Sequence, residues 1–158
     1  MRAALLATLL ISAIALAACG SSSSSSNSGG SGSSSSATVI TKKVAGYGTV
    51  LATPSGKTLY LSTADPAGGS KCTGSCTSTW PPLTAKGSPG AGAGVDSSML
   101  SSFKRSDGTE QVVYNKHALY THTGSGLTSG AGVAANGGIW YLVSPSGNPI
   151  KSTTGGGY

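Results

Sequence analysis

The chain contains an internal repeat, in which residues recur at a constant offset of 60 positions without a gap. The matched residues are Gly48-Thr49 with Gly108-Thr109, Leu59-Tyr60 with Leu119-Tyr120, Thr63 with Thr123, and Trp80 with Trp140. Two copies are fewer than the three or more that a solenoid needs to bury a continuous core. We therefore expect one domain in which two copies, at about 46–100 and 106–150, pack against each other and share one core.

Local signals within each copy predict antiparallel strands joined by tight turns. Segments 50–61 and 141–150 each carry Pro-Ser-Gly between apolar runs, where proline suits the second turn position and glycine accepts a positive φ. In segment 111–122 the corresponding residues are Asn115-Lys116, and asparagine tolerates the left-handed conformation. The chain has 25 glycines and 7 prolines, so helix signal is confined to the stretch where Asp96 is placed to cap one or two turns. The predicted fold class is all-β, with two antiparallel, hairpin-rich repeats and one short helix between the copies.

The first 36 residues predict export and anchoring. An apolar run follows Arg2 and is too short to span a bilayer permanently, which is typical of a signal peptide over residues 1–18. It ends in Leu-Ala-Ala-Cys, which resembles the bacterial lipobox, so we expect Cys19 to be lipidated with diacylglyceryl and palmitate chains. The alternative is ordinary secretory cleavage that leaves Cys19 as a free thiol.

The composition changes sharply after Ser36 and divides the rest of the chain. Residues 19–36 are expected to form a lipidated, flexible tether, because serine and glycine leave nothing to bury. Residues 37–152 are expected to form the β domain, and residues 153–158 a flexible tail. The predicted location is extracytoplasmic, on the bacterial cell membrane as a lipoprotein.

The charge balance restricts the class of partner. The full chain has a formal net charge of +6, and loss of Arg2 with the signal peptide leaves +5. The basic residues are scattered and lack the interleaved aromatic side chains of nucleic-acid binders, so no nucleic acid is expected. The expected partners are the membrane, through the N-terminal lipid, and an envelope protein or wall polymer.

The sequence lacks the short motifs of common hydrolases and transferases. It has no Gly-x-Ser-x-Gly elbow, no His-Glu-x-x-His and no phosphate-binding glycine loop followed by lysine. Asp107 and Glu110 are the only acids that lie close together, and the turn in Ser-Asp-Gly-Thr-Glu explains them. The sequence therefore favours a protein without catalytic residues and without a cofactor.

Cys72 and Cys76 stand in "CTGSCTSTWPP" and admit several kinds of chemistry. Attachment of a c-type haem needs Cys-x-x-Cys-His, whereas here the spacing is one residue longer and Thr77 follows. A redox dithiol is activated at the start of a helix, whereas Pro81 and Pro82 follow soon after this pair. We therefore expect a structural disulfide in an oxidising compartment, worth about 2 kcal/mol for a five-residue loop.

A zinc site is the remaining interpretation of the cysteine pair. Together with His117 and His122, the two cysteines satisfy the spacings within each half of a Cys2His2 set. The halves are forty residues apart, and a separation of five along a regular strand points the two imidazoles to opposite faces. The histidines are therefore only weak metal candidates, and no metal is expected. Trp80 and its repeat mate Trp140 are expected to be core anchors.

Four segments carry a resemblance to a known family: "GKTLYLSTAD", "CTGSCTSTWPPL", "DGTEQVVYNKHALYTH" and "GGIWYLVSPSG". They resemble the secreted lipoprotein repeats, bacterial lipoproteins of unknown function with a Tyr-x-aromatic-x-x-Asp motif. The resemblance covers about residues 46–149, and Cys-Thr-Gly-x-Cys before Trp-Pro-Pro-Leu is its most specific part.

The motif of this family points to four candidate binding residues. In the first copy, Tyr60 and Asp65 match it, although the spacing is one residue longer and no aromatic residue lies between them. In the second copy, Tyr120 is followed by His122 at the aromatic position and by Ser125 where the acid would align.

Together these features predict a lipid-anchored, non-enzymatic protein of the cell envelope that binds or scaffolds another component. Two alternatives remain open. The first is an extracytoplasmic redox or electron-transfer accessory that uses the cysteine pair. The second is a haem-binding or metal-binding lipoprotein.

Overall fold

The computed structural model describes residues 37–151, in which the regular secondary structure is almost entirely short β-strands joined by turns and loops. The strands are β1 (Ala37–Val44), β2 (Gly48–Ala52), β3 (Tyr60–Ser62), β4 (Gly90–Ala91), β5 (Leu100–Lys104), β6 (Glu110–Tyr114), β7 (His117–Ala118), β8 (Ala134–Ala135), β9 (Gly138–Val143) and β10 (Pro149–Ile150). The prediction of an all-β fold class is confirmed.

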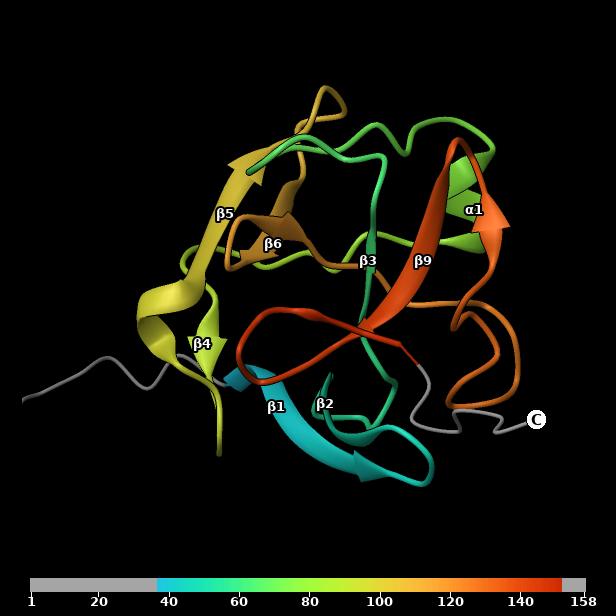
Figure 1. Cartoon of the computed structure of the whole chain (residues 1–158). Coiled ribbons are helices and arrows are strands. Elements are labelled where there is room, and N and C mark those ends of the chain that lie inside the picture. Colours follow the sequence, from blue (N-terminus) through green and yellow to red (C-terminus); the bar gives the residue numbers. More distant parts are fainter. Residues whose placement is uncertain (1–36, 152–158) are drawn as a thin grey trace, which may run out of the picture. The chain divides into compact units, whose positions relative to one another are not determined.

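The strands form three small sheets (Figure 1). The first has the order β2-β1-β4, the second β10-β9-β3 with β8 also paired to β9, and the third β5-β6-β7. Sequence neighbours pair antiparallel in each sheet, and β1 with β4 is a parallel pair. In contrast, β3 pairs with β9, which lies far along the chain.

The three predicted turns are present at their expected positions. Thr53 closes the first, donating its amide N–H to the Lys57 carbonyl at 2.8 Å. Asn115 and Lys116 both adopt positive φ, at 46° and 68°, as a tight two-residue hairpin turn requires. Gly147 has a φ of 78° in the turn between β9 and β10. These turns follow from local backbone preferences.

Four residues from distant parts of the chain pair side by side through their backbones and form a central row in the domain. Tyr60 and Tyr120 are its inner members, and each donates its amide N–H to the other's carbonyl, at 2.9 and 3.0 Å. On the outer sides, Leu142 pairs with Tyr60 and Pro82 pairs with Tyr120. The inner pair and the outer pair each consist of residues 60 positions apart.

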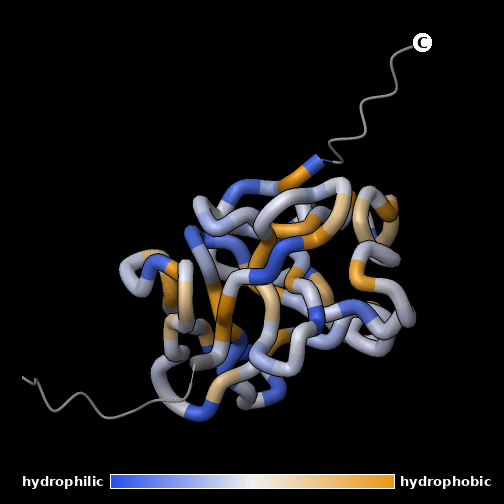
Figure 2. The backbone as a smooth tube through the Cα atoms, turned by 90° about the horizontal axis from the view of Figure 1, so that it is seen from below, coloured by the Kyte–Doolittle hydropathy of each residue, from blue (hydrophilic) through white to orange (hydrophobic). Residues whose placement is uncertain are grey.

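Four aromatic rings lie at the centre of the core. The rings of Trp80 and Trp140 stack with centroids 3.9 Å apart and planes within 3° of parallel. Tyr60 meets Trp80 edge-on at 5.5 Å, and Tyr120 meets Trp140 edge-on at 5.0 Å. All four side chains are at most 1% exposed. Figure 2 shows the hydrophobic stretches as short segments separated by pale and blue loops, so this small core lies among polar connections.

The prediction of a short helix after Asp96 is wrong in the length of the helix. Asp96 does act as an N-cap, accepting a hydrogen bond from the Ser98 amide at 2.9 Å, but only a 3-10 turn, Ser97–Met99, follows. Leu100 then begins β5, because pairing with Tyr114 of β6 overrides a weak local helix preference. The sequence analysis also missed a single α-helical turn, α1 (Cys76–Thr79), which precedes Trp80.

Candidate ligand-binding site

The four candidate binding residues fall into two separate groups. Tyr120 donates its hydroxyl to the Asp65 carboxylate, with 2.6 Å between the oxygens. Tyr60 and His122 lie together elsewhere, with ring centroids 6.1 Å apart and an edge-on geometry. Each tyrosine therefore meets a candidate residue from the other half of the chain rather than from its own motif.

Asp65 is the centre of a polar cluster that holds the cysteine loop. Its second carboxylate oxygen accepts the Lys71 amide N–H at 2.7 Å. The Tyr120 hydroxyl also contacts the Ser70 hydroxyl. Burial raises the pKa of the Tyr120 hydroxyl above its usual range, and the hydrogen bond to Asp65 adds to the rise. The hydroxyl therefore stays protonated and can donate to the carboxylate.

Arg105 extends this cluster into the core and was missed by the sequence analysis. It is 8% exposed, and its guanidinium donates to the Gln111 side chain, to the Ser70 hydroxyl at 3.3 Å and to the Cys72 carbonyl at 2.7 Å. Its Nε lies 3.6 Å from the carboxylate of the exposed Asp107. It is the single arginine among residues 37–151, and that rarity was the available signal.

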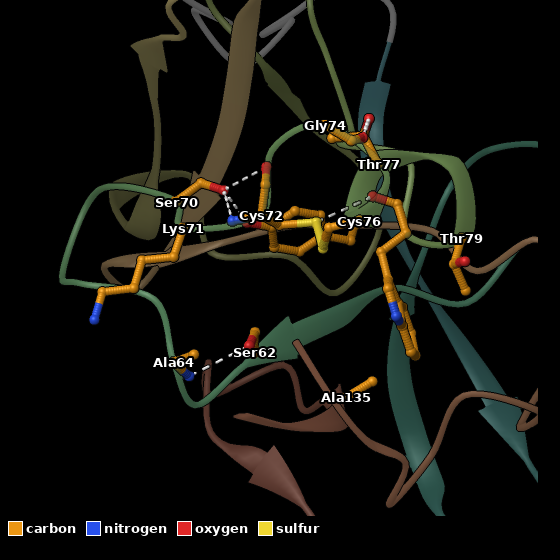
Figure 3. Close-up of a disulfide and its surroundings, with 12 residues drawn as sticks. Ser62, Ala64, Ser70, Lys71, Cys72, Gly74, Cys76, Thr77, Thr79 and Ala135 are labelled. Carbon is orange, nitrogen blue, oxygen red and sulfur yellow. Dashed lines mark hydrogen bonds between the residues drawn. A yellow bond between two sulfur atoms is a disulfide. The ribbon is translucent and has the colours of Figure 1, made fainter. Parts of the chain in front are cut away.

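The predicted disulfide between Cys72 and Cys76 is confirmed (Figure 3). Cys72 is 3% exposed and Cys76 is 7% exposed. Cys76 begins α1, contrary to the expectation that the nearby prolines exclude a helix, but one turn ending at Trp80 is all that forms. Because thiol exchange needs an accessible sulfur, this burial suits a structural bond. The closed loop brings the Cys72 carbonyl to Arg105.

A cavity of about 510 Å³ lies between the first hairpin turn and a glycine-rich loop. The turn contributes residues 55–58, and the loop contributes residues 122–127. Lys42 and Tyr60 complete the lining. Tyr60 donates its hydroxyl to the Leu127 carbonyl at 2.9 Å, which fixes the loop against the core. Two lysines, Lys42 and Lys57, and no acid line this cavity.

His122 is held in the cavity by the loop that follows it. Its ring lies 4.4 Å from the Trp80 ring, centroid to centroid. Nδ1 lies 3.1 Å from the Gly124 amide nitrogen and 2.9 Å from the Ser129 hydroxyl, so the loop holds the ring at this nitrogen. A Cβ on Gly124 would lie 2.6 Å from the His122 ring, so the close approach of this loop requires glycine.

The two lysines of the cavity carry charge that no acid neutralises. Lys42 is half-buried and donates its Nζ to the Gly56 carbonyl at 3.0 Å, whereas Lys57 is exposed. Within residues 37–151, the single salt bridge joins Arg105 to Asp107, so neither lysine is ion-paired there. The sequence analysis assigned Lys57 and the pair Lys42-Lys43 to a solvated surface and missed that Lys42 and Lys57 line one cavity.

The weak metal candidates His117 and His122 are not brought together into a metal site. No group of three or more His, Cys, Asp or Glu side chains suited to a metal exists in the described part of the chain. Both cysteines are consumed by the disulfide. Burial lowers the pKa of His117, and the Asp65 charge partly offsets this.

The predicted signal peptide, the predicted lipidation of Cys19, the predicted tether and the predicted tail at 153–158 lie outside the described residues. Between residues 37 and 151, no helix has the length and apolar character needed to cross a membrane.

Comparison with protein families gives a match to part of the chain. Residues 41–84 match a family described as a secreted repeat of unknown function. Searches of curated proteins and of solved structures found no match. The matched segment contains β2, β3, the disulfide and Trp80, so it includes the most specific motif of the resemblance. Residues 41–84 are therefore similar to a family described as secreted, in agreement with the resemblance found from the sequence.

Proposed function

We propose that this chain is a lipid-anchored protein of the bacterial cell envelope and that residues 37–151 form a non-enzymatic binding domain. The observation that carries the binding role is the cavity between the first turn and loop 122–127, with its two lysines and His122. Open cavities with a few convergent polar groups are the usual sites of ligands. The family's extracytoplasmic location makes an envelope component the natural ligand.

The anchoring role rests on the signal peptide and on Cys19. The serine- and glycine-rich stretch that follows has the composition of a tether and would hold the domain away from the lipid headgroups. Lipidation of this kind supplies more than one acyl chain, and stable anchoring needs at least two membrane-binding signals.

We infer that the domain is a duplicated unit whose two copies pack about a pseudo-twofold axis. The reciprocal pairing of Tyr60 with Tyr120 supports this arrangement, because it joins equivalent positions of the two copies. The stacked pair Trp80 and Trp140 does the same in the core. The copies differ at the cavity, where Ser125 of the second copy corresponds to Asp65 of the first. A ligand site in one copy alone is the expected result of such divergence.

Fractionation of cells tests the anchor. The wild-type chain is expected in the membrane fraction, and Cys19→Ala is expected to leave it, whereas the matched control Ser22→Ala is expected to remain. A processed Cys19→Ala protein that stays with the membrane would refute lipid anchoring through this residue.

Co-sedimentation tests the binding role. The full chain, purified in detergent, is mixed with isolated cell-wall and membrane material and pelleted. The double variant Lys42→Gln/Lys57→Gln is expected to pellet less than wild type, whereas Lys71→Gln/Lys86→Gln, with the same change in net charge, is expected to match wild type. Equal pelleting of the two double variants would show that the cavity is not the binding site.

A further inference from the structure

The lysine cavity, lined by Lys42, Lys57 and residues 122–127, is positive and is bordered by unused hydrogen-bond donors. Neither lysine has an acidic partner among residues 37–151. The loop adds main-chain donors, because the amides of Ser125 and Gly126 donate to no group in the described part of the chain. Ser125 adds an exposed hydroxyl, whereas the Thr123 hydroxyl already donates to the Thr79 carbonyl at 3.3 Å. Such a set of cations, a hydroxyl and successive amides stabilises an anion with several oxygens.

Comparison with the other half of the domain indicates what this cavity lacks. In the first copy, the Asp65 carboxylate accepts hydrogen bonds from Tyr120 and from the Lys71 amide, so that half contains its own anion. In the second copy, Ser125 corresponds to Asp65, and the space beside it is the cavity. The internal acid is therefore absent on the side where the two lysines gather.

The donor types favour phosphate over carboxylate. The forked guanidinium of arginine matches carboxylates and phosphates alike, whereas lysine binds a phosphate as a point charge. The single arginine of the described chain is committed to the buried cluster around Ser70. A loop with successive free amides is likewise a recurrent means of holding phosphate. The cavity, at about 510 Å³, also has room for the group that carries the phosphate.

We propose that the lysine cavity is a binding site for a phosphate group borne by an extracytoplasmic ligand, with Lys42, Lys57 and the amides of Ser125 and Gly126 as its donors. This inference rests on the proposed binding role and names the ligand chemistry of the same site.

Amide chemical shifts of the full chain in detergent micelles test the site directly. Glycerol 3-phosphate is the probe, glutarate is the carboxylate comparison, and glycerol is the neutral control. Saturable shifts are expected at the Ser125 and Gly126 amides with glycerol 3-phosphate, weaker ones with glutarate and none with glycerol. The double variant Lys42→Gln/Lys57→Gln is expected to bind about tenfold more weakly or worse, from the loss of two charged contacts.

A pair of variants at Ser125 tests the electrostatic argument. Ser125→Asp gives the second copy the acid of the first, and it is expected to bind glycerol 3-phosphate at least about tenfold more weakly than Ser125→Asn, which has the same size without the charge. Near-ultraviolet circular dichroism of the tryptophan stack checks that each variant is folded.

Three results would overturn the inference: no saturable shift at these amides, tighter binding of glutarate than of the phosphate, or equal affinities of the two Ser125 variants. The binding role is judged separately by co-sedimentation. If the lysine variant loses envelope binding while glycerol 3-phosphate does not bind, the proposal of a phosphate ligand is refuted and the binding role remains. If glycerol 3-phosphate binds but envelope material does not, the proposed envelope-binding role is refuted and the phosphate site remains.

Discussion

Removing the Tyr120 hydroxyl is expected to destabilise the domain because it leaves Asp65 short of a partner. The Tyr120 ring is fully buried, so Tyr120→Phe keeps the apolar contacts and deletes the hydrogen bond to the carboxylate. A hydrogen bond to a charged group contributes about 1.5–3 kcal/mol. The free energy of unfolding at pH 7 should fall by this amount, which corresponds to a decrease in Tm of about 6–12 °C for a domain near 100 residues.

The same hydroxyl predicts a dependence on alkaline pH. Because the pKa of Tyr120 is raised in the folded state, the unfolded chain loses this proton first, near its usual pKa of about 10. The stabilisation is therefore complete below pH 10 and is lost as the pH rises further. By pH 11 the difference in unfolding free energy between wild type and Tyr120→Phe should have narrowed by about 1.4 kcal/mol.

Urea unfolding followed by tryptophan fluorescence, at pH 7 and at pH 11, measures both effects. Tyr60→Phe is the matched control at pH 7, because its hydroxyl donates to the neutral Leu127 carbonyl. Tyr60→Phe should lower the free energy of unfolding by about 1 kcal/mol, which is less than the decrease expected for Tyr120→Phe. The reasoning is refuted if Tyr120→Phe is as stable as wild type at pH 7, or if the difference between them does not change up to pH 11.

Three further perturbations have expected outcomes. Replacing Cys72 and Cys76 together by alanine should lower the unfolding free energy by about 2 kcal/mol in urea, and dithiothreitol should then have no further effect on the variant. Gly130→Ala would place a Cβ 2.5 Å from the Trp80 ring, so it should cost about 1–3 kcal/mol and weaken the near-ultraviolet circular dichroism of the tryptophans. The lowered pKa of His117 means that wild-type stability should fall as the pH drops below about 6.5, and His117→Gln should reduce that fall in acid titrations of unfolding.

Features set by neighbouring residues could be predicted from the sequence. The Pro-Ser-Gly turns and the left-handed Asn115 follow from backbone preferences that operate over a few residues. The disulfide follows because its cysteines are four positions apart. Asp96 caps its turn as predicted, but the length of the helix was decided by a strand partner, Tyr114, that local propensity does not register.

Features made by distant residues could not be predicted. Arg105 reaches Ser70 across 35 positions, and apart from its rarity among residues 37–151 the sequence does not mark it as buried. Tyr120 bonds Asp65 across 55 positions, although the family motif associates each tyrosine with the acid of its own copy. The lysine cavity likewise depends on a turn and a loop that are joined by hydrogen bonds from Thr58 and Tyr60 to the distant Leu127 carbonyl. In each case the partner is fixed by the topology.

The central row also bears on how the protein reaches its compartment. The backbone of Tyr60 pairs with Tyr120 and with Leu142. The first strand of this row, β3, therefore stays unpaired until almost the whole domain has been synthesised. Pairings of such long sequence separation form slowly, because the entropy of closing a large loop is lost before any contact stabilises the closed chain. We therefore expect a partly synthesised chain to lack the completed central row. For the export predicted from the first residues, this delay would keep the chain unfolded until its last strands are available.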